Sequence, residues 1–71
     1  MADLTPLRSL KDPNKFRKFT IQPSEGKPIR VRDWLSFMVS PSGRTLCAFD
    51  QRGRFRIIDA ALVERIEISQ T

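Results

Sequence analysis

Histidine and tyrosine are absent from the 71 residues, and cysteine occurs once, at Cys47. Without histidine, neither a histidine general base nor a Cys-His nucleophilic pair can form. A single cysteine without histidine also cannot build an ordinary zinc site. The three glycines stand apart in the sequence, so no phosphate-binding loop is present. We therefore predict a protein that is not an enzyme and that uses no cofactor or metal.

Long apolar runs are missing as well. No stretch approaches the roughly 20 consecutive apolar residues that a membrane-spanning helix requires. The N-terminus lacks the pattern of a secretory signal peptide. One cysteine cannot form an internal disulfide, and Cys47 is interpreted as a small buried hydrophobic residue of a strand rather than a reactive thiol. These features predict a cytoplasmic protein without a membrane partner.

Positive charge, in contrast, is plentiful and unevenly distributed. Thirteen Lys and Arg against eight Asp and Glu give a net charge of +5. Between residues 8 and 56 there are twelve basic and four acidic residues, a local balance of +8, whereas the chain from Ile57 onward is mildly acidic. A chain of this length forms one small domain. The composition therefore favours a small basic binding module.

Residues 29–59 carry the clearest structural pattern, which predicts three consecutive strands at 29–39, 45–50 and 54–59. Apolar residues alternate with arginines along them, as expected when successive side chains leave opposite faces of a sheet. Residues 41–44 and 50–53 supply Gly-containing turns, and the order of 50–53 is typical of a type I turn closed by a G1 bulge. Asp33 interrupts the apolar phase, which predicts a bulge or kink between Arg32 and Trp34.

The flanking segments complete the expected order of elements. Residues 15–22 alternate and predict the first strand, and residues 65–69 predict the last, with Ile66 and Ile68 facing inward. A single helical turn is expected within residues 59–64, with Asp59 as its cap. Thr5-Pro6 is a helix-start signal with Thr5 as N-cap, and this short helix either docks or stays mobile. The chain thus divides into an N-terminal arm or short helix, residues 1–14, and a small β domain, residues 15–71.

Five short strands with one helical turn before the last is the element order of small SH3-like and Sm-like barrels. This resemblance of order implies a mainly β fold with a small five-stranded, antiparallel, barrel-like sheet. The alternative is an open antiparallel sheet covered by the N-terminal helix, which would leave two unpaired edges. The core expected for a closed sheet consists of Phe19, Ile21, Ile29, Val31, Leu35, Phe37, Phe55, Ile57 and Ile66.

The alternating arginines suggest a function. Arg30 and Arg32 on the strand at 29–39 would lie about 7 Å apart, and so would Arg54 and Arg56 on the strand at 54–59. This spacing is similar to that of successive phosphates. Trp34 would add a stacking platform for a base, or would turn into the core at the kink. We predict binding of nucleic acid, DNA or RNA, by an arginine-rich sheet face. The predicted contact residues are Arg17, Lys18, Lys27, Arg30, Arg32, Trp34, Arg52, Arg54 and Arg56.

Two other interpretations fit the same residues. The outer face of a small antiparallel sheet must be polar, and arginine stems cover apolar surface well, so the pattern also arises without a ligand. Alternatively, an adaptor or inhibitor would bind a larger protein through a strand edge or through the loop at 23–28, with Trp34 or Phe16 as an aromatic anchor. The same edges would allow a homo-oligomer.

Overall fold

The computed structural model describes residues 4–69, which contain six short strands and three 3-10 helices. The fold is mainly β, as predicted. The helices are η1 (Thr5–Lys11), η2 (Trp34–Ser36) and η3 (Ala60–Leu62). The strands are β1 (Phe19–Pro23), β2 (Ile29–Val31), β3 (Phe37–Val39), β4 (Thr45–Phe49), β5 (Phe55–Asp59) and β6 (Val63–Ile68).

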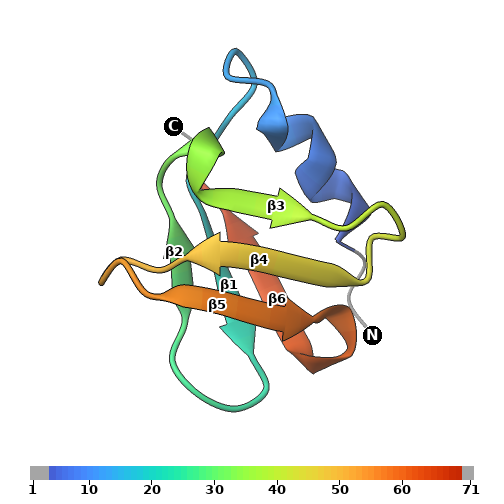
Figure 1. Cartoon of the computed structure of the whole chain (residues 1–71), viewed down its shortest axis with the longest axis vertical. Helices are drawn as coiled ribbons and strands as arrows, with labels where there is room; N and C mark the ends of the chain where they lie inside the picture. Colours follow the sequence, from blue (N-terminus) through green and yellow to red (C-terminus); the bar gives the residue numbers. More distant parts are fainter. Residues whose placement is uncertain (1–3, 70–71) are drawn as a thin grey trace.

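The strands form two antiparallel three-stranded sheets, in the orders β2-β1-β6 and β3-β4-β5. The sheets face each other across the core, and their strands cross at a steep angle in Figure 1. The predicted five-stranded barrel-like sheet is not confirmed, because within residues 4–69 no strand pairing joins one sheet to the other. In that same part of the chain, no helix is long and apolar enough to cross a membrane.

The chain passes from the first sheet to the second at Asp33, the residue that interrupts the apolar alternation. It forms η2 there, and Asp33 caps this helix, because Asp33 Oδ1 accepts a hydrogen bond from the backbone N–H of Leu35 at 3.1 Å. The predicted position of the kink is confirmed, but a helical turn replaces the expected bulge and divides one predicted strand into β2 and β3. Leu35 was predicted in the core, yet it lies in this turn and is 67% exposed.

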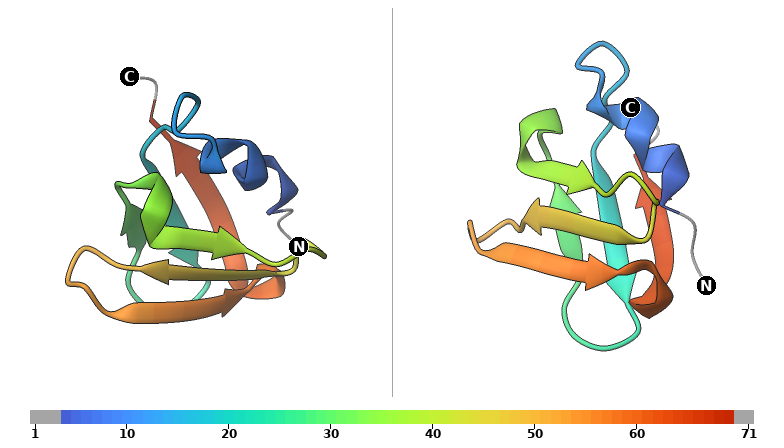
Figure 2. Two further views of the ribbon diagram at one scale, coloured as in Figure 1. Left: turned by 45° about the horizontal axis from the view of Figure 1, so that its top comes forward. Right: turned by 45° about the vertical axis from the view of Figure 1, so that its right-hand side comes forward.

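Helix η1 docks against the sheets, which decides between the two alternatives for this segment. Leu4, Leu7 and Leu10 are buried, and the helix lies beside β3 and η2 (Figure 2). The prediction of Thr5 as N-cap is wrong, because Thr5 is the first helical residue and Leu4 precedes it. Among residues 4–69, the buried core consists of Leu4, Leu7, Leu10, Phe19, Ile21, Ile29, Val31, Phe37, Leu46, Ala48, Ile58, Ala60 and Val63.

Lys11 connects η1 to η2 and β3 through hydrogen bonds to two backbone carbonyl groups. Its Nζ donates hydrogen bonds to the carbonyl oxygen of Trp34 at 2.8 Å and to that of Phe37 at 2.6 Å. The same ammonium group lies 4.8 Å from the centroid of the Phe37 ring, close enough for a cation–π interaction. A seven-residue helix has little stability of its own, so these contacts and the buried leucines hold it in place.

The inward face of β5 was predicted wrongly. Phe55 and Ile57 were expected in the core, but Ile57 is 65% exposed and Phe55 is exposed as well, whereas Ile58 is only 7% exposed. Residues directly opposite each other in a ladder share a face of the sheet. The hairpin pairs Phe49 with Phe55, which places Ile58 opposite the buried Leu46. The register of the hairpin therefore decides which residues of β5 face inward.

The ends of the fold also differ in detail from the predictions. β1 begins at Phe19 rather than at residue 15, and the preceding Phe16 is half-buried, with its ring 6.3 Å from that of Phe19. In β6, Ile66 is half-buried as part of the core's edge, but Ile68 is exposed rather than inward. The cap of η3 is as predicted, since Asp59 Oδ1 accepts a hydrogen bond from the N–H of Ala61 at 2.9 Å.

Candidate nucleic-acid interface

Two open hollows lined by basic side chains adjoin each other around β2. The first lies between Pro28 and the β4–β5 turn, and the second lies over β1 and β2. A hydrogen bond connects the two regions, because Gln51 Oε1 in the turn accepts from the backbone N–H of Arg30 at 3.3 Å. We call the basic side chains of the two hollows the basic band: Lys27, Arg52, Arg54 and Arg56 in the first, and Lys18, Arg30 and Arg32 in the second.

Seven of the nine predicted contact residues belong to this band. The other two, Arg17 and Trp34, line neither hollow. Trp34 is half-buried beside Lys11, and its ring centroid is 5.7 Å from the ammonium nitrogen. Trp34 therefore lies outside the lining of both hollows, and its role as a stacking platform stays a prediction.

The band differs from the predicted arrangement in one respect. The two arginine pairs were expected to share one sheet face, but Arg30 belongs to the first sheet and Arg56 to the second. Along β5, the outward-facing side chains are Phe55 and Ile57, so Arg56 points to the other side, where it lines the first hollow. The basic residues meet across the space between β2 and the β4–β5 turn rather than on one surface of a sheet.

Two carboxylates also line the hollows, and each of them has an arginine partner. Asp50 Oδ2 lies 3.7 Å from a terminal nitrogen of Arg56, and Glu67 Oε1 lies 3.3 Å from Nε of Arg65. Within residues 4–69, no other ion pair is formed. Six members of the basic band, all except Arg56, therefore have no carboxylate partner among the described residues.

The β4–β5 turn carries two of these six side chains on a firmly bonded backbone. Asp50 Oδ1 accepts hydrogen bonds from the N–H groups of Arg52 at 2.9 Å and Arg54 at 3.0 Å. The Asp50 N–H donates to the carbonyl of Arg54, and the Gly53 N–H donates to the carbonyl of Asp50, both at 2.9 Å. Gly53 adopts a φ of +77°, as a G1 bulge requires. The predicted turn chemistry is confirmed.

The turn should make stability depend on pH in the acid range. The Arg54 N–H bond lowers the pKa of Asp50, opposed by burial and reinforced by the Arg52 N–H and by the charges of Arg56 and Arg54. A carboxyl whose pKa is depressed in the folded state stabilises the fold above its unfolded pKa of about 3.9, and this contribution is lost as the pH falls through the folded value. We expect the melting temperature of Asp50→Asn to vary less than that of wild type below about pH 4.

Thermal melts monitored by circular dichroism at a series of pH values would check this expectation. The exposed Glu64 on β6 provides the control, because Glu64→Gln removes a carboxylate outside the turn and leaves the Asp50 hydrogen bonds in place. An Asp50→Asn profile parallel to that of wild type would contradict the role given to this carboxylate.

Gln51 is the residue of this region that the sequence did not reveal. Its contact with Arg30 joins residues 21 positions apart, and no local pattern encodes such a bond. In the described part of the chain, His, Cys, Asp and Glu form no group of three or more that could hold a metal ion. Comparisons with models of protein families, with curated proteins and with solved structures found no match for this chain.

Proposed function

We propose that this protein binds nucleic acid through the basic band, as a small regulator or accessory factor without catalytic activity of its own. The observation that carries the proposal is that six cationic side chains without a carboxylate partner line two adjoining hollows. Clustered like charges repel one another and create a local positive potential. A polyanion that lies along the band would relieve this repulsion.

The residue types of the band suit phosphate better than bases. A guanidinium group holds a phosphate through two parallel hydrogen bonds, and four of the six unpaired cations are arginines: Arg30, Arg32, Arg52 and Arg54. Contacts to phosphates supply affinity but carry little sequence information. In the described part of the chain, Phe19 is the one aromatic residue that lines either hollow, and its side chain is buried. We therefore expect slight sequence preference.

Salt dependence tests the proposal directly. Arg30→Ala combined with Arg54→Ala removes one cation from each hollow. If each arginine holds one phosphate, the slope of log affinity against log salt should become shallower by about 1.8 for duplex and about 1.4 for single strands. Fluorescence anisotropy with labelled oligonucleotides, between about 50 and 300 mM salt, measures this slope. Replacing both arginines with lysine keeps the charge and should weaken binding less than alanine does.

A matched control separates the band from net charge alone. Lys15 and Arg17 are exposed and line neither hollow, so their replacement by alanine removes the same charge elsewhere. This control should change the salt slope less than the Arg30/Arg54 pair does. Equal effects of the two pairs, or wild-type binding no tighter than about 100 μM at low salt, would exclude the band as a nucleic-acid interface.

Two further expectations belong to this proposal. The likeness of element order to SH3-like and Sm-like barrels is supported by the position of η3 directly before β6 and by the continuity of β2, η2 and β3 along the chain. A cytoplasmic location would give the basic band access to nucleic acid and would keep the one cysteine reduced.

Binding of a larger protein is the second candidate, and one observation favours it. A third hollow lies where the loop at 23–28 meets η3 and β5, and its lining includes Pro23, Glu25, Ile57 and Leu62. A pull-down with purified protein, after nuclease treatment and a high-salt wash, tests this candidate. Retention of one partner that is lost with Leu62→Glu would favour it over nucleic-acid binding.

A further inference from the structure

The outer face of the β3-β4-β5 sheet, on the side away from the core, is apolar. Met38, Cys47 and Ile57 lie in one cross-strand row, and Phe49 and Phe55 form the next pair. Leu35 in η2 adjoins them, and all of these side chains except the half-buried Cys47 are exposed. We call this surface the apolar face: Leu35, Met38, Cys47, Phe49, Phe55 and Ile57.

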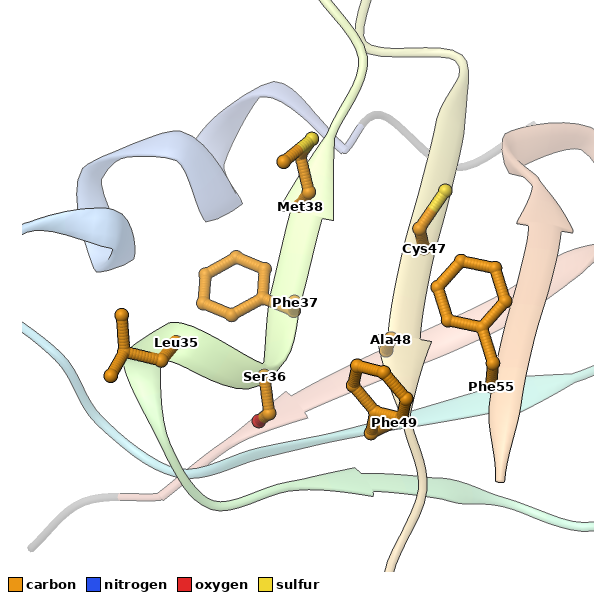
Figure 3. A pocket seen from close by; sticks show the side chains of 8 residues that line it. All are labelled: Leu35, Ser36, Phe37, Met38, Cys47, Ala48, Phe49 and Phe55. Atoms are coloured by element: carbon orange, nitrogen blue, oxygen red, sulfur yellow. The ribbon is translucent and has the colours of Figure 1, made fainter. Parts of the chain in front are cut away.

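The apolar face is hollowed near its centre. A depression of about 210 Å³ lies between Leu35 and Met38 on one side and the rings of Phe49 and Phe55 on the other (Figure 3). The two ring centroids are 5.4 Å apart, with the ring planes tilted by 59°. Among the residues that the structure describes, none that is charged lines the depression, whose lining consists of Leu35, Ser36, Phe37, Met38, Cys47, Ala48, Phe49 and Phe55.

An uncovered face of this kind is unusual for a sheet that has its core on the other side. An antiparallel sheet with one face in water normally alternates apolar and polar residues. Here β3 (Phe37–Val39) consists of apolar residues throughout, and so does β4 (Thr45–Phe49) after its first residue. Continuous apolar strands are typical of sheets that are buried on both faces. A contiguous exposed apolar patch indicates an interaction surface.

We propose that a second copy of this chain covers the apolar face, so that the protein forms a homodimer by packing the two β3-β4-β5 sheets against each other. The area agrees with this occupant. The five exposed side chains of this face, together with the half-buried Cys47, offer about 600 Å² per copy, so a dimer would bury about 1,200 Å² in total. That value lies at the lower end of the range for specific, stable interfaces.

The chemistry of the face also favours a second copy over other occupants. Nucleic acid needs cationic partners, and within residues 4–69 no cationic residue lines the depression. A charged side chain near the two-fold axis of such an interface would lie opposite its own copy, so an uncharged face suits a symmetric dimer. Homodimer interfaces are in addition more apolar than the interfaces of transient complexes. Face-to-face packing of two sheets, about 10 Å apart, is the common way to cover such surfaces.

Sedimentation analysis of nuclease-treated protein over a concentration series tests the proposal. Wild type should be dimeric near 100 μM and should dissociate on dilution, whereas Met38→Glu and Phe55→Glu should be monomeric at the same concentration. Both side chains are exposed in the single chain, so the variants should fold, and circular dichroism melts would verify this. Ile68→Glu provides the control, because Ile68 is also exposed but lies in β6 of the other sheet, and this variant should still dimerise.

The single cysteine gives a second, local readout, since Cys47 lies within the apolar face. Its rate of alkylation by a maleimide should fall as the wild-type concentration rises, and should stay constant for Phe55→Glu. A monomeric wild type at about 100 μM would overturn the proposal. So would a dimer that persists in both glutamate variants, or a dimer in which Cys47 reacts as fast as it does in the monomer.

Discussion

Phe37→Ala is expected to lower the free energy of unfolding by about 3 to 5 kcal/mol, whereas Ile57→Ala should change it by less than about 0.5 kcal/mol. The Phe37 ring is buried, and it packs edge-on against Phe19 with a centroid distance of 5.0 Å. Its removal would leave a cavity between the two sheets, next to Lys11 of η1. Ile57 points outward from β5, so its truncation removes little buried surface from a single chain.

Urea denaturation of both variants, in protein dilute enough to be monomeric, gives this comparison. The pair is informative because the sequence alone places Phe37 and Ile57 in the same core. Equal losses of stability would mean that β5 presents its other face to the core. A stability of Phe37→Ala close to that of wild type would contradict the position of β3 as well.

Lys11→Met should lower the free energy of unfolding by about 2 to 3 kcal/mol, although the residue is a lysine near the start of the chain. Methionine keeps most of the apolar stem but removes both hydrogen bonds from Nζ and leaves the carbonyl groups of Trp34 and Phe37 without this donor. Hydrogen bonds from a charged donor contribute about 1.5 to 3 kcal/mol, and an unsatisfied buried acceptor adds to the cost. The same denaturation experiment measures the change.

Lys15→Met is the matched control for this variant, because Lys15 is exposed beyond the end of η1. We expect it to be close to neutral. Hydrogen exchange would show in addition whether η1 detaches alone, since the amides of Leu7 and Leu10 should lose protection before those of β4 do. Equal stability of the Lys11 and Lys15 variants would show that the two carbonyl contacts contribute nothing.

The features that could be predicted from the sequence depend on chemistry within a few residues. The turn at 50–53, the cap at Asp59 and the interruption at Asp33 each arise from a side chain that bonds to its own neighbouring backbone. The strand alternation also predicted correctly that Ile29 and Val31 face the core. These hydrogen bonds join residues close in the sequence, so they do not depend on how the rest of the chain folds.

The features that were missed depend on partners distant in the sequence. β5 has apolar residues at 55, 57 and 58, so alternation allows either face to be buried, and only its pairing with β4 decides. The Lys11 contacts span 23 and 26 residues and have no sequence signature. The apolar face was missed for a related reason. Alternation with a period of two was interpreted as a strand with one buried side, whereas the β3-β4-β5 sheet carries apolar side chains on both of its faces.

The candidate interface shows the same division. Its basic residue types could be predicted from composition and spacing, because charge accumulates between residues 8 and 56. Its shape could not, since the two hollows are connected through the hydrogen bond between Arg30 in β2 and Gln51 in the β4–β5 turn. Two sheets, rather than one, supply the band.

The hydrogen-bonded turn at 50–53 has a consequence for the thermodynamics of association. Four hydrogen bonds fix the backbone that carries Arg52 and Arg54, so little main-chain freedom remains to be lost when a ligand arrives. Ordering of flexible loops is one of the main entropic costs of complex formation. In this turn, the entropy lost on binding would come mainly from the side-chain rotamers of Arg52 and Arg54. The favourable entropy of counterion release would therefore be opposed by a smaller loss of conformational entropy.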